Sequence, residues 1–173
     1  MSGPVLHIPN LKYRHGDLFA NIPAEGTVIV PHICNDVYVM GSGFVVPLKR
    51  RWPVVEQKYM IDKPGLGQVQ FVDVHKDDHG KVIVANMVAQ RSTVRPDNPK
   101  PIKYLALAKC MDEVGDLART ENAEIHCPLF GAGLAGGNWD FIEELICELW
   151  ACGRDLKVVV HQLPGEALRD PTP

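Results

Sequence analysis

One segment constrains the fold of this chain more than any other, because it joins a short apolar run, a glycine-rich loop and a helix. The apolar run covers residues 124–130, the loop is Gly-Ala-Gly-Leu-Ala-Gly-Gly at 131–137, and the helix opens at Asn138. Backbone NH groups of such a loop can face a ligand because no Cβ blocks the approach, and the helix dipole behind them adds about half a positive charge. The segment predicts a strand–loop–helix unit that binds an anion, and phosphate is the anion we expect.

Strand and helix patterns alternate along the rest of the chain. Residues 28–34 are apolar and β-branched, as in a buried strand, and a second glycine loop follows at 41–43. Residues 69–74 and 81–85 flank a turn containing Asp and Gly and predict an antiparallel hairpin. Apolar residues at spacings of three and four predict two helices. Their apolar faces comprise Ile102, Leu105, Ala108, Met111, Val114 and Ala118 in the first helix and Ile142, Leu145, Ile146 and Leu149 in the second.

The second helix is expected to end at Gly153 in a left-handed cap, and residues 156–161 predict a last strand. The proline-rich residues 91–101 predict an exposed loop. Strands that alternate with helices, together with one hairpin, predict an α/β protein: a three-layer α/β/α sandwich around a central mixed β-sheet. We expect a single domain over residues 1–163 and a flexible C-terminal tail over residues 164–173.

Composition narrows the function. A net charge of −3 with interspersed signs gives no electrostatic reason to expect a nucleic-acid or membrane surface as partner. Five cysteines without a C-x-x-C pair argue against a disulfide framework and a zinc site, so no metal is expected. The first residues lack a signal-peptide pattern, and no apolar stretch reaches the ~18 residues of a membrane span. These features predict a cytoplasmic protein with no membrane partner.

The glycine loop also fits G-x-G-x-x-G, the fingerprint of dinucleotide cofactors, through Gly131, Gly133 and Gly136. That fingerprint normally lies in the first βαβ unit of a large sheet. Here only about 37 residues follow it, enough for one helix and one strand, and no acidic residue lies about 20 positions on at a second strand end. We therefore expect no nicotinamide or flavin cofactor.

Five segments in the order found here resemble a macrodomain over about residues 12–163. They are Gly16-Asp17-Leu18-Phe19, His32-Ile-Cys-Asn35-Asp36, Met40-Gly-Ser-Gly-Phe44, Ala85-Asn-Met87 and the loop from Gly131 to Trp139. The resemblance implies an ADP-ribose cleft at the strand ends. It implies that Asp17 accepts the adenine amino group, that Asn35 and the 41–43 backbone hold the distal ribose, and that residues 131–136 cradle the diphosphate. The expected ligand-binding residues are Asp17, Leu18, Asn35, Gly41, Ser42, Gly43, Phe44, Gly131, Ala132, Gly133, Leu134, Ala135 and Gly136.

The same resemblance bears on catalysis. Relatives that remove ADP-ribose from acidic side chains carry an aspartate directly after the Gly-Leu of the second loop and a lysine after the middle strand. This chain has Ala135 and, near the second position, Ala89-Gln90, and alanine can neither take a proton nor form an imine. The Gly-Leu-Ala-Gly-Gly form is similar to that of phosphate-processing relatives, in which an anion cradle and a positioned water could act without a covalent nucleophile.

We therefore expect the chain to bind ADP-ribose and to hydrolyse an ADP-ribose derivative: ADP-ribose 1''-phosphate to ADP-ribose and phosphate, or an ADP-ribosyl linkage. The catalytic candidates are Asp36 to orient the water, Asn35 to place the ribose and His32 to donate a proton. Each has a structural alternative, as a turn residue or a packed histidine. The carrier of the ADP-ribose stays open between a free metabolite, a protein and a nucleic acid.

Two other functions are weighed against hydrolysis. A reader that binds ADP-ribose without turnover is favoured by Ala135. A thiol hydrolase built on Cys34 and His32 is disfavoured, because Cys34 has no cationic or helix-start environment that would lower its pKa.

Overall fold

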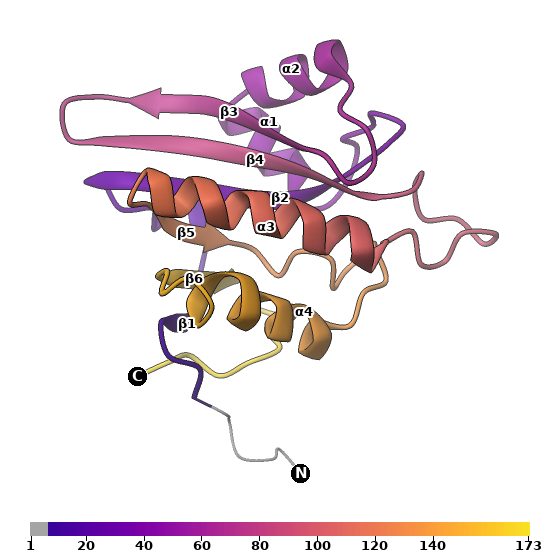
Figure 1. Ribbon diagram of the computed structural model, residues 1–173. Helices are drawn as coiled ribbons and strands as arrows, with labels where there is room; N and C mark the ends of the chain where they lie inside the picture. The colour runs from indigo at the N-terminus through magenta and orange to yellow at the C-terminus, as the bar shows by residue number, and fades with distance from the viewer. Residues whose placement is uncertain (1–6) are drawn as a thin grey trace.

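A mixed six-stranded sheet forms the centre of the molecule in a computed structural model that describes residues 7–173 (Figure 1). The strand order is β1-β6-β5-β2-β4-β3. The strands are β1 (Leu11–His15), β2 (Gly26–Asn35), β3 (Val69–Lys76), β4 (Gly80–Gln90), β5 (Glu124–Cys127) and β6 (Val158–Gln162). All pairings are parallel except that of β3 with β4, which is the predicted hairpin at one edge.

Helices cover both faces of this sheet, which confirms the predicted three-layer sandwich. They are α1 (Val45–Arg51), α2 (Val54–Asp62), α3 (Tyr104–Thr120) and α4 (Trp139–Ile146), with a 3-10 turn η1 (Leu18–Ala20) and a π-helical turn η2 (Cys147–Ala151). Alternate residues of β2 enter different cores, because successive side chains of a strand point to opposite faces. Ile29 packs with α3 and α4, whereas Val28 and Val30 pack with α1 and α2.

The apolar face of α3 differs from the predicted one. Leu105 is 79% exposed, and Leu107 is fully buried in its place. Steps of three residues turn by only about 300° in a helix, so a chain of such steps drifts away from one face. Ile102 lies before the helix and instead forms a bridge with Gln90.

The predicted left-handed cap at Gly153 is wrong, although glycine is required there. The left-handed residue near this helix end is Asp155, with φ 54°. A Cβ at position 153 would lie 1.8 Å from the carbonyl oxygen of Glu148, so Gly153 serves close backbone approach after the wide π turn.

The C-terminal segment lies along the domain and ends beside β1 (Figure 1). Its composition predicted a flexible tail, but the segment is tied down by contacts remote in sequence. Thr172 N donates to Tyr13 O at 2.9 Å, and Tyr13 N donates to Thr172 Oγ1 at 2.9 Å, so the tail covers the open edge of β1. Residues 1–6, where no targeting signal was expected, lie outside the described residues.

Across residues 7–173, no helix combines the length and the apolar character needed to cross a membrane.

Candidate functional site

A cleft of about 690 Å³ opens at the carboxyl ends of the parallel strands. Its lining comes from the segment after β1, the end of β2 with the loop into α1, the loop after β5, and the end of β6 with the tail. The lining includes Asp17, Leu18, His32, Ser42, Gly43, Phe44, Gly131, Ala132, Gly133, Leu134, Ala135, His161, Glu166 and Leu168.

The position of the cleft follows from the topology. Strands β2 and β5 are neighbours, but the chain leaves β2 toward α1 on one face and leaves β5 toward α4 on the other. Diverging connections open a crevice at the carboxyl ends of adjacent parallel strands, where ligands bind in open α/β sheets. The volume lies within the range of small-molecule sites.

The glycine loop after β5 forms a wall of this crevice through two tight reversals. Gly137 N donates to Gly131 O at 2.7 Å, and Gly136 N donates to Gly133 O at 3.0 Å. At Gly131, φ is 80° and a Cβ would lie 2.9 Å from the Cδ1 atoms of three isoleucines. Gly133 faces open space, with nothing within 4 Å of a Cβ built on it. The predicted strand–loop–helix unit is thus present, with its open side toward the cleft.

Helix α4 begins directly behind this loop. The side chain of Asn138 caps the helix by accepting a hydrogen bond from Phe141 N at 3.1 Å, and Asn138 N donates to Tyr104 Oη at 2.8 Å. The positive end of the helix dipole therefore lies beside the glycine loop.

Asp17 caps a turn and also lies in the cleft lining. Its Oδ1 accepts a hydrogen bond from Phe19 N at 3.0 Å and so caps η1, and the exposed residue also lines the cleft. Leu18, at the same site, is buried. Strand β1, which ends just before these two residues, was not identified in the sequence because its partner β6 lies far along the chain.

The second glycine loop, at residues 41–43, also contributes to the lining of the cleft. Ser42, Gly43 and Phe44 line it, and Gly43 has φ 77°. The ring of Phe44 stacks on that of Phe19 with centroids 5.4 Å apart. Gly41 and, in the other loop, Gly136 are not among the described residues that line the cleft.

The side chains of Asn35 and Asp36 form hydrogen bonds to nearby backbone groups, and neither residue is among the described residues that line the cleft. Asn35 Oδ1 accepts from Val37 N at 3.2 Å and from Val39 N at 3.1 Å, and its Nδ2 donates to Val39 O at 2.7 Å. Asp36 Oδ1 accepts from Ser92 N at 2.7 Å. Both side chains therefore shape the loop after β2, the structural alternative that the sequence left open.

His32 lines the cleft from β2 but is 2% exposed. Its Nε2 lies 2.5 Å from Asn86 Oδ1, while Asn86 Nδ2 donates to Gln70 Oε1 at 3.0 Å. Because the amide oxygen of Asn86 can only accept, His32 Nε2 carries the hydrogen and Nδ1 is a bare acceptor. Nδ1 has no partner among the described residues, and burial lowers the pKa of His32 to about 4. The ring is neutral near pH 7.

The environment of Cys34 opposes a thiol nucleophile. Its Sγ lies 3.7 Å from His32 Nε2, but the thiol is buried in the core. Burial raises the pKa of Cys34 well above its usual value, so the thiolate is disfavoured.

The cleft also contains residues that the sequence analysis missed. His161 and Gln162 come from β6, and Gly165, Glu166 and Leu168 come from the tail. Their position could have indicated them. Strand β6 lies between β1 and β5 and is parallel to both, so its carboxyl end lies at the same edge of the sheet as the cleft. Within residues 7–173, no three His, Cys, Asp or Glu side chains are grouped so as to hold a metal ion.

The fold and the cleft together define an α/β/α sandwich with a glycine loop beside a cleft at the strand ends. No protein-family model matches the chain. A solved macrodomain protein from Streptomyces coelicolor is 32% identical with a TM-score of 0.69, and the match covers 87% of this chain and 97% of that chain. The chain therefore belongs to the macrodomain family.

The chain is also similar over most of its length to two proteins whose names give no function. A protein of unknown function from Bacteroides thetaiotaomicron is 34% identical with a TM-score of 0.76, covering 91% of this chain and 100% of that one. An uncharacterized 17.5 kDa protein of Enterobacteria phage T4 is 31% identical over 144 residues, which are 79% of this chain and 87% of the phage protein.

Two more distant relatives have named ligands or activities. The ADP-ribose 1''-phosphate phosphatase of Candida albicans is 23% identical over 146 residues, covering 80% of this chain and 92% of that protein. DarTG of Thermosipho africanus, solved in complex with ADP-ribose, shares the fold with a TM-score of 0.69 at 20% identity, covering 94% of this chain and 43% of that one.

Proposed function

We propose that this macrodomain binds ADP-ribose in the cleft at the carboxyl ends of β1, β6, β5 and β2. The observation that carries the proposal is the glycine loop at 131–137, which faces the cleft at Gly133 and has the N-terminus of α4 behind it. Backbone NH groups and a helix dipole at one place suit a diphosphate. The complex of Thermosipho africanus DarTG with ADP-ribose supports the same ligand.

Other lining residues suit the adenine and the distal ribose of that ligand. Asp17 offers a carboxylate, which can accept but not donate a hydrogen bond and so suits the amino group of adenine. Ser42, Gly43 and Phe44 would enclose the distal ribose, and the glycine loop at 131–137 would bind the diphosphate that joins this ribose to the adenosine. The ADP-ribose could be free or carried by a protein or a nucleic acid.

Calorimetry with ADP-ribose tests the binding proposal, and a Gly133→Val variant makes the test specific to the loop. Valine fits the backbone there, because Gly133 does not require positive φ and has open space around it. Its methyl groups would occupy the place of the diphosphate, so we expect micromolar binding by the wild type and at least about tenfold weaker binding by the variant. Equal affinities for ADP-ribose would contradict the assignment of the loop.

A second candidate function is hydrolysis of ADP-ribose 1''-phosphate to ADP-ribose and phosphate, as in the Candida albicans phosphatase. In this reaction water attacks phosphorus, the bond to the ribose oxygen breaks, and that oxygen takes up the proton that the water releases, while the glycine loop holds the diphosphate of the substrate. His32 lines the cleft, but its unpartnered Nδ1 is buried and its Nε2 faces Asn86, so a role as the proton donor expected from the sequence is disfavoured. Asn35 and Asp36 would contribute by shaping the loop after β2, because their polar atoms are engaged there.

Phosphorus NMR with ADP-ribose 1''-phosphate separates hydrolysis from reading. Growth of an inorganic phosphate signal would establish the phosphatase, and loss of that growth in a His32→Gln variant would place His32 in it. Line broadening without phosphate would select a reader module, the function favoured by Ala135 and by a cleft without a well-placed general base. A parallel assay for release of ADP-ribose from ADP-ribosylated proteins tests whether the protein cleaves an ADP-ribosyl linkage instead.

We also propose the cytoplasm as the working compartment, because all five cysteines are free thiols. Fractionation of cells expressing the protein tests this assignment.

A further inference from the structure

The tail forms one wall of the cleft before it returns to β1. Gly165, Glu166 and Leu168 line the cleft, and a turn closed by Glu166 N donating to Leu163 O at 3.1 Å shapes this stretch. The wall has little core of its own, because Leu163 is 48% and Leu168 49% exposed. Its position must therefore be set by polar contacts.

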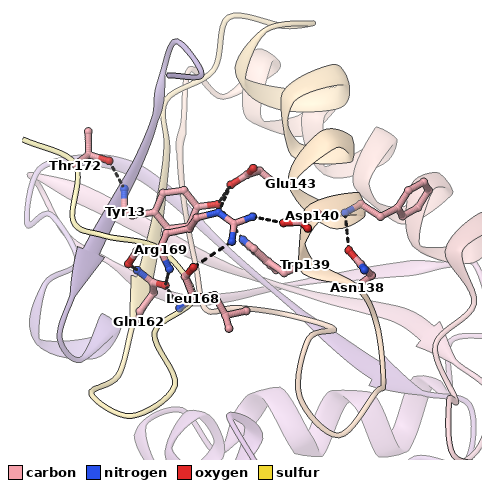
Figure 2. Close-up of polar contacts among 10 residues, drawn as sticks. Tyr13, Asn138, Trp139, Asp140, Glu143, Gln162, Leu168, Arg169 and Thr172 are labelled. Atoms are coloured by element: carbon pink, nitrogen blue, oxygen red, sulfur yellow. Dashed lines mark hydrogen bonds and ion pairs between the residues drawn. The ribbon is translucent and has the colours of Figure 1, made fainter. Parts of the chain in front are cut away.

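Arg169 supplies the strongest of these contacts (Figure 2). Its Nη2 donates to Asp140 Oδ1 at 2.5 Å and its Nε donates to Glu143 Oε2 at 3.2 Å, so one guanidinium joins two carboxylates in the first turns of α4. Nη1 donates to Leu168 O at 3.1 Å within the wall itself. The Arg169 side chain is 24% exposed and that of Glu143 is 19% exposed, so this ion pair is better shielded than a surface pair.

The side chain of Gln162, at the end of β6, fixes the backbone of Leu168 and Arg169. Gln162 Oε1 accepts from Leu168 N at 2.8 Å and from Arg169 N at 3.0 Å, and its Nε2 donates to Arg169 O at 3.0 Å. The side chain of Gln162 is almost fully buried. The wall is thus tied to the sheet through Gln162 and to α4 through Arg169.

The α4 end of this connection reaches back to β1 and to the glycine loop. Glu143 also accepts a hydrogen bond from Tyr13 Oη, which in turn accepts from Trp139 Nε1 at 2.9 Å (Figure 2). Burial and the neighbouring Glu143 raise the pKa of Tyr13, so the phenol keeps its proton as the donor. Trp139 is the first residue of α4, and only Asn138 separates it from the glycine loop. Arg169 therefore joins the wall to the helix that carries the phosphate site.

We propose that Arg169 is a positioning residue for ligand binding, which holds the C-terminal wall of the cleft against α4. This role rests on the proposed binding of ADP-ribose. Because the wall adjoins β6 and β1, near Asp17, it serves the adenine half of the ligand rather than the distal ribose. Without the ion pairs the wall would have to be ordered by the ligand, at the expense of affinity.

An Arg169→Gln variant tests this role, with Arg154→Gln as its matched control. Arg154 joins Asp112 and Asp116 at 2.5 and 3.0 Å and a backbone carbonyl of η2, so it has the same chemistry away from the cleft. We expect Arg169→Gln to weaken ADP-ribose and AMP by about tenfold and ribose 5-phosphate by less than about twofold. Arg154→Gln should leave all three affinities unchanged, and Arg169→Lys, which keeps the charge, should recover part of the loss.

Hydrogen exchange of residues 164–169 without ligand gives an independent readout. The exchange should rise in Arg169→Gln and fall again when ADP-ribose saturates the variant. Equal affinities of wild type and Arg169→Gln, or equal losses for AMP and ribose 5-phosphate, would overturn the positioning role while leaving ADP-ribose binding intact. If the wild type itself bound no ADP-ribose, the proposed function would fail and this role with it.

Discussion

At the scale of single residues, the glycines of the 131–137 loop have different duties. Gly131 needs its positive φ and has no space for a Cβ, whereas Gly133 has neither constraint and borders the cleft. Gly131 is therefore required for the loop conformation, whereas Gly133 is the glycine for which we propose a role in ligand binding.

A Gly131→Ala substitution is expected to destabilise the protein. A left-handed backbone costs a non-glycine residue about 1–2 kcal/mol, and contact with three isoleucine methyl groups adds to it. Thermal unfolding checks the prediction, with Gly133→Ala as the methyl-matched control that should unfold near the wild-type temperature. Equal unfolding temperatures for the two variants would argue against this account of the loop.

His32 should make folding stability depend on pH on the acid side of neutrality. Burial lowers the pKa of its imidazole from 6.5 to about 4, so the unfolded chain binds this proton more readily than the folded chain. The free energy of unfolding should therefore fall by up to about 1.4 kcal/mol per pH unit as the pH drops from 6.5 toward 4.

Urea titrations at several pH values measure this slope. The free energy of unfolding of His32→Gln should change less steeply with pH than that of the wild type. The difference between the two slopes is the contribution of the histidine, because the carboxylate contributions are common to both proteins. Parallel slopes for the two proteins would show that His32 titrates normally.

At the scale of elements, the start of α4 couples helix formation to the site. Asn138→Ala removes the acceptor for Phe141 N and should cost about 1 kcal/mol of folding stability. Asn138→Ser, which keeps a capping oxygen, should retain most of it. Denaturant unfolding of the three proteins gives the comparison, and a full loss in the serine variant would refute the cap.

Elements whose signals are local could be predicted from the sequence. The hairpin of β3 and β4, the glycine loop and the Asn138 start of α4 depend on residues within a few positions of one another. Strand β1 could not be identified, because its pairing with β6 involves residues about 147 positions later. Gly153 was misinterpreted because its close neighbour, Glu148 O, becomes adjacent only through the π turn.

The candidate site divides in the same way. The resemblance placed Asp17, His32, Ser42, Gly43 and residues 131–135, and these residues line one cleft, whereas Gly41 and Gly136 do not. It could not show that Asn35 and Asp36 bond the surrounding backbone, because those partners depend on how the loop folds. Nor could composition show that Arg169 anchors the tail, because its carboxylate partners are on α4.

At the scale of the whole molecule, burial separates the five thiols into two groups. Cys34, Cys110 and Cys127 are buried and burial raises the pKa of each, whereas Cys152 is exposed. Cys147 is half-buried, and its contact with Cys152 raises its pKa to about 11.

A thiol-reactive dye should therefore label Cys152 quickly, Cys147 slowly and the other three only after unfolding. Timed labelling followed by peptide mass analysis gives the order directly. Fast labelling of Cys34 in the native protein would contradict the packing of its core and would revive a nucleophilic role for it.

The pairing of β1 with β6 also has a consequence for synthesis on the ribosome. The second strand of the chain can pair with β4 once residue 90 has emerged, but β1 stays without a partner until the last strand has left the exit tunnel. The part of the cleft beside Asp17 is therefore completed only after residue 162 has emerged, and the nascent chain carries β1 without its partner until then.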